Sequence, residues 1–302
     1  MFDVVIVGGS AAGLSAALIL GRFKRKVLVC DTGKPRNARS QAVHSFFTRD
    51  GIAPQEMFQI AHDQLKPYPT VELRQQEVMD VKKLGDHFEV LLADGAQVEA
   101  SYILLATGVR DELPPIAGLE RLWGRGVFHC PYCHGWEARD KSIAILADLH
   151  HAEHLAALMH TLSDDIVICT NGQSNMPPSD EDISKFANIG VRVIPTAIAE
   201  VKASDGILEG IQFEGGSYLP REAIFVATRQ QQHSALPATL GCEFTENGLV
   251  KVDGNGLTSV DRVYAAGDMA SPKQQVLYAA AQGAWSAAWI NTLLAQQVFA
   301  TQ

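Results

Sequence analysis

The sequence predicts an α/β protein built from two similar domains, the second inserted in the first. The chain has 302 residues, more than one small hydrophobic core requires. Strand and helix patterns alternate as a βαβ unit at residues 2–30 and again at residues 142–170. A stretch with two consecutive prolines, residues 111–118, lies between these units and is typical of a linker.

The expected elements of the first domain begin with buried parallel strands. Residues 2–7 form a continuous apolar run, as in a strand covered on both faces. Helical spacing follows at 12–24 and a second buried strand at 26–30. The Asp94–Gly95 turn predicts a hairpin. The remaining elements expected here are strands 87–92, 97–105 and 262–268 and a helix at 273–297.

The inserted domain is expected to repeat this pattern. Its predicted strands are 142–147, 166–170 and 223–228, with a helix at 151–162 and paired strands at 191–201 and 207–213. Residues 229–239 are expected to form the return linker. The predicted domains are therefore 1–112 with 236–302, and 113–235.

Composition excludes several classes of protein. Apolar residues make up 47% and charged residues 20%, so disorder is not expected as the main state. The formal charge of -9, without a basic run, argues against binding nucleic acid or anionic lipid.

The cysteine count and the N-terminal segment bear on location. Five cysteines do not suit a secreted disulfide framework. Residues 4–20 are apolar, but no Lys or Arg precedes them and glycines interrupt them, so neither a signal peptide nor a membrane span is expected. The predicted location is the cytoplasm.

A glycine-rich turn follows the first strand and opens the first helix. It matches the dinucleotide-binding pattern G-x-G-x-x-G, except that Ser10 replaces the middle glycine. The N–H groups of such a helix start favour a pyrophosphate, and Asp31 at the next strand end can bind ribose hydroxyls. The predicted contacts are Gly8, Ser10, Ala11, Ala12, Gly13 and Asp31.

This turn alone does not distinguish FAD from NAD. Gly267–Asp268 ends a later strand, where an aspartate can contact the ribityl chain of a flavin, although the pair could also be a turn with a helix cap. Together with Ala106, Thr107 and Gly108 it favours FAD. Arg36 and Val78 complete this part of the predicted FAD set.

The segment around Cys130 and Cys133 carries the redox chemistry. A Cys-x-x-Cys pair at a helix start can close a disulfide, and the helix lowers the thiolate pKa. His134 is a candidate acid/base, since the pKa of histidine lies near neutrality. The alternatives are a zinc site completed by His129 and His134, or two unpaired thiols. The other three cysteines, Cys30, Cys169 and Cys242, are expected in the core.

With these motifs in this order, the chain resembles the low-molecular-weight thioredoxin reductase family over nearly its whole length. The resemblance implies a homodimer with two Rossmann-like domains of three layers (ββα/βα), FAD, and a redox disulfide in the inserted domain. His134 stands where the family has Asp, which resembles the thioredoxin-reductase-like dithiol oxidases and members that do not use nicotinamide. The resemblance also implies flavin contacts from His44, Gln274, Gln275 and Val276.

The inserted domain departs from the family's nucleotide motif. Leu149 stands in place of the glycine that permits close approach to a pyrophosphate, and Asp148 adds a negative charge. Thr170-Asn171-Gly172-Gln173 contains no cation for a 2′-phosphate. We therefore expect NADPH binding to be lost. His150, His151 and His154 are expected to be solvated helix residues rather than metal ligands, and no metal is predicted.

The sequence thus predicts an FAD-dependent dithiol/disulfide oxidoreductase. By analogy with the family, Cys133 faces the flavin and Cys130 exchanges with the substrate, a thioredoxin-like protein or a small dithiol. One hypothesis is a reductase with another electron donor, such as a ferredoxin. A second is a dithiol oxidase that closes a disulfide in a small molecule and reduces oxygen. A flavin-binding sensor without turnover is a third, which the intact Cys-x-x-Cys argues against.

Overall fold

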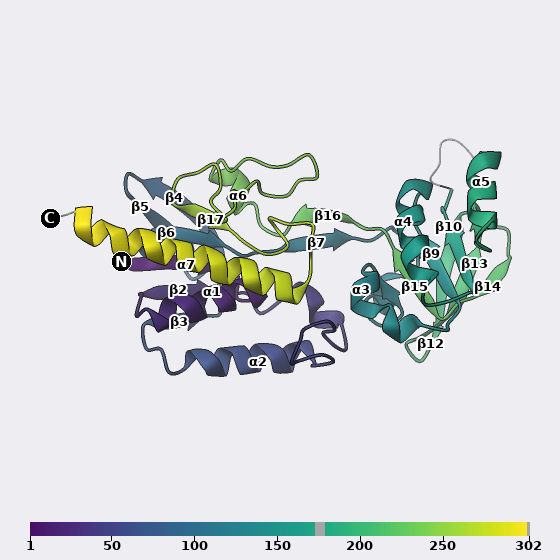
Figure 1. Cartoon of the computed structure of the whole chain (residues 1–302), viewed down its shortest axis with the longest axis horizontal. Coiled ribbons are helices and arrows are strands. Elements are labelled where there is room, and N and C mark those ends of the chain that lie inside the picture. The colour runs from purple at the N-terminus through teal and green to yellow at the C-terminus, as the bar shows by residue number, and fades with distance from the viewer. Residues whose placement is uncertain (173–178, 301–302) are drawn as a thin grey trace. The chain divides into compact units, whose positions relative to one another are not determined.

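The computed structural model describes residues 1–172 and 179–300, and the chain divides into two compact units (Figure 1). Unit 1 contains Met1–Ala38, Ile52–Arg110 and Gln230–Gln302, and unit 2 contains Arg39–Gly51 and Asp111–Arg229. Both are α/β structures, as predicted.

Unit 1 is built on a seven-stranded sheet in the order β3-β2-β1-β6-β5-β4, with β17 also paired to β6. The strands β1, β2, β3, β6 and β17 are parallel, whereas β4, β5 and β6 form antiparallel pairs. Its elements are β1 (Phe2–Val7), α1 (Ala11–Arg22), β2 (Val27–Cys30), α2 (Pro54–Leu65), β3 (Val71–Arg74), β4 (Val78–Leu84), β5 (His87–Leu92), β6 (Gln97–Leu105), α6 (Leu236–Thr239), β17 (Val263–Ala265) and α7 (Val276–Ala300). A short 3-10 helix, η1 (Arg36–Arg39), ends at the unit's border.

Alternate side chains of β1 enter two different cores. Val4 and Ile6 pack with α1 and α7 on one face of the sheet, and Val5 and Val7 pack with the β4–β5 side on the other. The helices α1 and α7 approach closely because α7 has Gly283 at the contact, where an added Cβ would lie 1.9 Å from the carbonyl oxygen of Ala12. This packing fixes the start of α1 at the carboxyl end of β1.

Unit 2 contains a five-stranded parallel sheet, β11-β10-β9-β15-β8, and a three-stranded antiparallel sheet, β12-β13-β14. The strands are β8 (Val127–Phe128), β9 (Ile143–Leu146), β10 (Ile166–Cys169), β11 (Arg192–Ile194), β12 (Ile198–Ser204), β13 (Ile207–Phe213), β14 (Tyr218–Pro220) and β15 (Ala223–Val226). The helices are η2 (Glu120–Leu122), α3 (Pro131–His134), η3 (Trp136–Ala138), α4 (Leu149–Met159) and α5 (Asp180–Ala187). Separate cores lie on the two faces of β9.

Three details differ from the sequence prediction. The expected strand 191–201 is two strands, because β11 pairs in parallel with β10 while β12 pairs with β13. Both expected linkers begin in a strand, since β7 (Val109–Glu112) pairs with β16 (Arg229–Gln232), whereas residues 113–116 have no regular secondary structure. Apolar side chains beyond these strands, such as Ile116 and Leu236, enter the cores of units 2 and 1, respectively.

The domain boundaries differ in one larger respect. Residues Arg39–Gly51 belong to unit 2, although the prediction placed them in the first domain. The reason is a set of hydrogen bonds and ion pairs between this segment and the redox motif, described below. Linear sequence order did not reveal these long-range contacts.

The three cysteines outside the redox motif are buried in the cores, as predicted. Burial raises the pKa of Cys30 to about 11 and that of Cys169 to about 12, and it also raises the pKa of Cys242. These thiols are therefore protonated at neutral pH. Within the described residues, no helix has the length and apolar character needed to cross a membrane.

Candidate active site

The glycine turn of unit 1 brings three backbone segments into close contact. Gly8 has φ +108°, and an added Cβ would lie 2.3 Å from the carbonyl oxygen of Ala106. At Gly13 an added Cβ would lie 1.9 Å from the carbonyl oxygen of Gly8. Both positions therefore require glycine. Ser10 is the N-cap residue of α1, and its side chain makes no capping hydrogen bond, so the helix start is not capped by its own side chain.

Asp31 lies at the end of β2 beside this turn, as predicted. One carboxylate oxygen accepts the Gly9 N–H at 2.8 Å, and the other accepts the Gly33 N–H at 2.8 Å. Each oxygen has a second lone pair, so the carboxylate can still accept hydrogen bonds from ribose hydroxyls.

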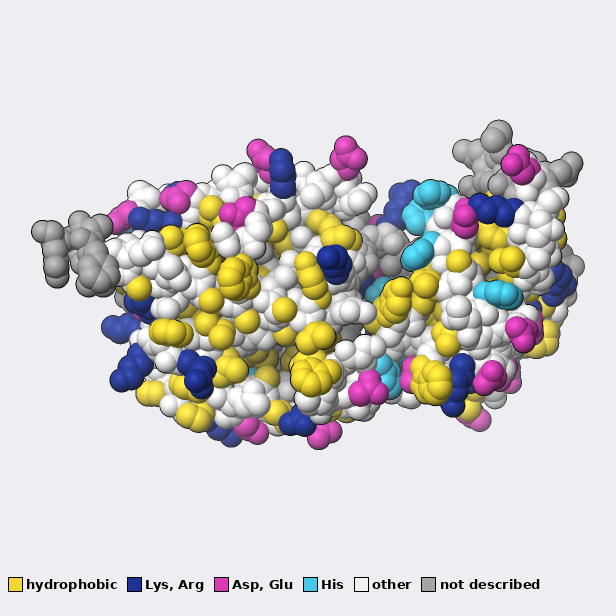
Figure 2. Space-filling model, viewed as in Figure 1, with side chains coloured by type: hydrophobic (Ala, Val, Ile, Leu, Met, Phe, Trp, Pro, Cys, Tyr) yellow, Lys and Arg dark blue, Asp and Glu magenta, His cyan; other side chains and the backbone are white. Residues whose placement is uncertain are grey.

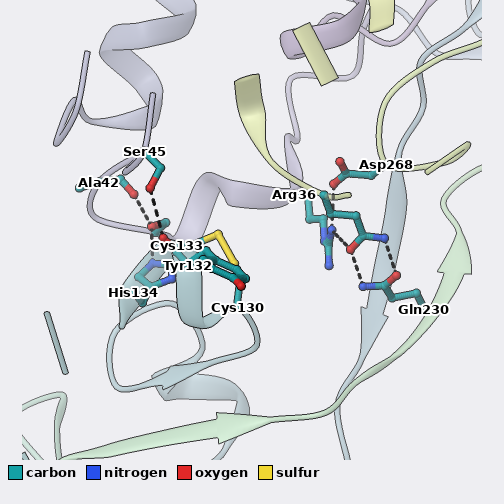
Figure 3. Close-up of a disulfide and its surroundings, with 11 residues drawn as sticks. Arg36, Ala42, Ser45, Cys130, Tyr132, Cys133, His134, Gln230 and Asp268 are labelled. Carbon is teal, nitrogen blue, oxygen red and sulfur yellow. Dashed lines mark hydrogen bonds and ion pairs between the residues drawn. A yellow bond between two sulfur atoms is a disulfide. The ribbon is translucent and has the colours of Figure 1, made fainter. Parts of the chain in front are cut away.

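A polar network joins the other predicted flavin residues of unit 1 (Figure 3). The Arg36 guanidinium donates to Asp268 at 2.8 Å and to the side-chain oxygen of Gln274 at 2.7 Å. The amides of Gln274 and Gln230 exchange hydrogen bonds at 2.5 and 2.6 Å. Gly267 has φ +83° and donates its N–H to Gln282. The structure thus brings Arg36, Asp268 and Gln274 together, and adds Gln230 and Gln282, which the prediction missed.

The remaining predicted residues of unit 1 lie on the same elements. Ala106, Thr107 and Gly108 follow β6, and Val78 is buried at the start of β4. Gln275 and Val276 stand at the start of α7. Their contacts with FAD stay a prediction.

In unit 2, Cys130 and Cys133 form a disulfide, with 5.3 Å between their Cα atoms (Figure 3). Cys130 is the N-cap residue of α3, and Pro131 occupies the first helical position, where a missing N–H costs nothing. Both cysteines are half-buried. The pair is therefore held at a short helix start, as predicted.

His134 packs into the unit instead of projecting into solvent. Its ring stacks on Phe128, with 4.4 Å between ring centroids, and its Nε2 lies 3.1 Å from the Ser40 hydroxyl oxygen. Burial, aided by His129 and His44 and opposed by Glu137, lowers the pKa of His134 to about 4. The expectation of a pKa near neutrality is therefore wrong, because the cationic form loses its hydration in this position.

The segment Arg39–Gly51 lies against the redox motif. The Ser45 hydroxyl donates to the carbonyl oxygen of Tyr132 at 3.3 Å. His44 lies 3.4 Å from Glu137 through Nε2 and 3.6 Å from Asp50 through Nδ1. His44 therefore belongs to unit 2, whereas the other predicted flavin residues belong to unit 1, and its contact with the flavin stays a prediction.

The N-terminus of α4 is closed by an acidic cap. The Asp148 carboxylate accepts the backbone N–H of His151 at 2.9 Å and also contacts the His151 ring at 2.8 Å. Partial burial raises the pKa of Asp148, but hydrogen bonds from the His151 backbone and ring outweigh this and lower it overall. A negative charge thus occupies the helix end where a nucleotide-binding domain receives phosphates.

The residues that follow strand β10 also form contacts within the protein. The Asn171 side chain accepts the Ile198 N–H at 2.7 Å. Thr170 is 2% exposed, and Gln173 lies outside the described residues.

His150, His151 and His154 are exposed along α4. Across residues 1–172 and 179–300 there is no group of three or more His, Cys, Asp or Glu side chains suited to a metal ion.

Similarity to known proteins agrees with this arrangement. The chain matches the pyridine nucleotide-disulphide oxidoreductase family over residues 2–288. The thioredoxin reductase tcpT of Claviceps purpurea is 32% identical over 277 residues, which cover 88% of this chain and 86% of that protein.

Solved structures resemble the whole fold. The crystal structure of HlmI has 34% identity and a TM-score of 0.94, covering 99% of this chain and 94% of that one. An oxidoreductase from Agrobacterium tumefaciens has 34% identity and a TM-score of 0.90, covering 97% and 98%. With its glycine turn, its Cys130–Cys133 disulfide and these relatives, the chain belongs to the pyridine nucleotide-disulphide oxidoreductase family and is a flavin-dependent disulfide oxidoreductase of the thioredoxin reductase type.

Proposed function

We propose that this chain is an FAD-dependent dithiol/disulfide oxidoreductase that works without NADPH. It exchanges electrons between a partner's thiols, the Cys130–Cys133 pair and the flavin. The observation that carries the proposal is the cap at α4, where the Asp148 carboxylate accepts the His151 N–H at the helix end that would otherwise receive a pyrophosphate.

The residues of unit 1 fit FAD. Gly8 leaves backbone space where a Cβ would collide with Ala106, and the start of α1 has no side-chain cap. Asp31 retains acceptor capacity for a ribose, and Asp268, held by Arg36, is available to the ribityl chain. FAD, when bound, supplies a two-electron carrier that the protein's own side chains lack.

The chain's own residues carry the thiol chemistry. A substrate thiolate attacks one sulfur of the Cys130–Cys133 disulfide, and the second substrate sulfur completes the exchange, leaving the two cysteines reduced. We assign Cys130 to the substrate and Cys133 to the flavin by the family resemblance. His134 is neutral at physiological pH because burial lowers its pKa to about 4, so it holds no extra proton to donate before the exchange begins.

Three features of unit 2 oppose NADPH. Leu149 replaces a glycine, Asp148 places a carboxylate at the phosphate position, and Asn171 is already bonded to Ile198. At about 1–3 kcal/mol for lost close contacts and uncompensated charge, the combined effect is an affinity lower by roughly 10³-fold or more.

Anaerobic reduction of the yellow protein tests the proposal. NADPH, NADH and dithiothreitol are mixed separately with the holoprotein while the flavin absorbance is followed. We expect bleaching by the dithiol and none by micromolar NADPH, and rapid bleaching by NADPH would overturn the proposal. The variant Cys133→Ser is the matched control, since it should keep bound FAD but lose bleaching by the dithiol.

Admitting air after reduction separates the two forms of this activity. Peroxide formed at the rate of dithiol consumption would identify a dithiol oxidase that closes a disulfide in a small molecule. Slow reoxidation by air would favour a reductase that exchanges with a thioredoxin-like protein and takes electrons from a donor such as a ferredoxin. In either form we expect the enzyme to work in the cytoplasm.

We also expect a homodimer, and α7 offers a surface for it. Leu277, Trp285 and Trp289 are 44%, 57% and 37% exposed, and Trp285 follows Leu277 by eight residues and precedes Trp289 by four, which places them on one side of the helix. Figure 2 shows hydrophobic side chains gathered over this helix. Exposed apolar stripes of this kind mark association surfaces. Light scattering should give twice the chain mass, and Trp285→Glu should lower it toward that of one chain.

A further inference from the structure

The hydroxyl of Ser40 determines which nitrogen of His134 carries a proton. Its oxygen lies 2.7 Å from the carbonyl oxygen of Ala42 and 3.1 Å from His134 Nε2 (Figure 3). A serine has one hydroxyl proton, and a carbonyl oxygen can only accept. The proton of Ser40 therefore points to Ala42, and Ser40 offers a lone pair to Nε2. His134 Nε2 must then be the donor.

The other ring nitrogen, Nδ1, carries no proton. Nδ1 is buried and has no hydrogen-bond partner within the part of the chain that the structure describes. The ring is neutral above about pH 5, since burial lowers the pKa of His134 to about 4. A neutral imidazole protonated on Nε2 has its free lone pair on Nδ1.

We propose that Ser40 is a positioning residue for dithiol exchange, which holds His134, the residue after Cys133, in the Nε2–H tautomer with Nδ1 unprotonated. This inference rests on the proposed function for its chemistry, but the tautomer itself does not depend on the electron donor. The Ala42 carbonyl is required for this effect, because it accepts the Ser40 hydroxyl proton and so keeps that proton from turning toward Nε2.

The dithiol exchange at this disulfide balances. A substrate dithiol R(SH)₂ and the Cys130–Cys133 disulfide become a substrate disulfide and two cysteine thiols. One S–S bond breaks and one forms, and two electrons pass from substrate to the cysteine pair. Two protons follow them. Both protons pass from the substrate sulfurs to the cysteine sulfurs.

Nitrogen-15 NMR of histidine-labelled, oxidised holoprotein reads the tautomer directly. The His134 signals are assigned by their loss in His134→Gln. We expect Nε2 protonated and Nδ1 unprotonated in the natural chain, and the same in Ser40→Thr, which keeps the hydroxyl. Ser40→Ala should give a mixture of tautomers. Ser45→Ala is the matched control, because Ser45 lies in the same segment but bonds the Tyr132 carbonyl instead of His134.

A single-turnover assay links the tautomer to chemistry. Oxidised dithiothreitol formed in one turnover should appear roughly tenfold more slowly with Ser40→Ala, and at the natural rate with Ser40→Thr and Ser45→Ala. An Nδ1–H tautomer in the natural chain, or a Ser40→Ala variant with unchanged tautomer and rate, would overturn the inference. Bleaching of the flavin by NADPH would instead overturn the proposed function and leave the tautomer result standing.

Discussion

Removing the His134 imidazole should change how the stability of the protein depends on pH. In the folded protein burial is the main cause that lowers the pKa of His134 to about 4, from an ordinary value of 6.5. His129 and His44 act in the same direction, and Glu137 acts against them. As the pH falls from 6.5 toward 4, the unfolded chain binds a proton at this residue and the folded chain does not. Folding stability must therefore decrease as the pH falls through this window.

The size of the effect follows from the two pKa values. At about 1.4 kcal/mol for each tenfold change in proton affinity, the difference between 6.5 and about 4 corresponds to roughly 3 kcal/mol. This stability is fully present above pH 6.5 and is lost by about pH 4. In His134→Gln this contribution is absent, because glutamine does not titrate.

Urea unfolding of the natural protein and of His134→Gln, at a series of pH values from 7 to 4, measures this pH-dependent contribution. The loss of the free energy of unfolding on acidification should be smaller in His134→Gln by up to about 3 kcal/mol. Replacing the exposed His154 by Gln in the same way is a control that should leave the curve unchanged. Parallel curves for the natural protein and His134→Gln would refute the argument that His134 is neutral because it is buried.

Three further predictions concern backbone contacts and the cap. Gly283→Ala should lower the free energy of unfolding by about 1–3 kcal/mol, since its Cβ would meet the Ala12 carbonyl at 1.9 Å; Gly254→Ala, with open space around it, should be neutral in the same denaturant titration. Gly8→Ala should give protein with little bound flavin on purification, and normal flavin content would contradict the fit described for unit 1. Asp148→Ala should reduce thermal stability by about 1 kcal/mol through loss of the α4 cap, and an unchanged melting temperature would show that the cap contributes nothing.

The features found from sequence were those encoded by neighbouring residues. The glycine turn after β1 and the Cys130–Cys133 pair are contiguous motifs, and the structure places both where the prediction did. Buried strands such as β1 and β10 were found because every side chain in them is apolar or nearly so.

The features that sequence did not reveal depend on contacts between distant positions. Ser40 and His134 are 94 residues apart, and Gln230 and Gln274 are 44 apart. Nothing in the immediate neighbours of Ser40 indicates a partner on the redox motif. The prediction of a near-neutral pKa for His134 was wrong for the same reason, since its burial against Phe128 is a property of tertiary packing. The Asp–x–x–His spacing of the α4 cap was a visible signal, because a side chain at the N-cap accepts the N–H three residues later.

The contact between α1 and α7 also affects the order in which the two units can fold during synthesis. Unit 1 begins with the first residue, yet its sheet lacks β17 and its core lacks Ile290 and Leu294 until the last segment of this chain emerges from the ribosome. All residues of unit 2 have been made by Arg229. The second unit can therefore fold while the first still exposes the apolar face of β1 and α1. During that interval the nascent chain contains a folded unit 2 and an incompletely folded unit 1, and unit 1 is the part that needs protection from aggregation.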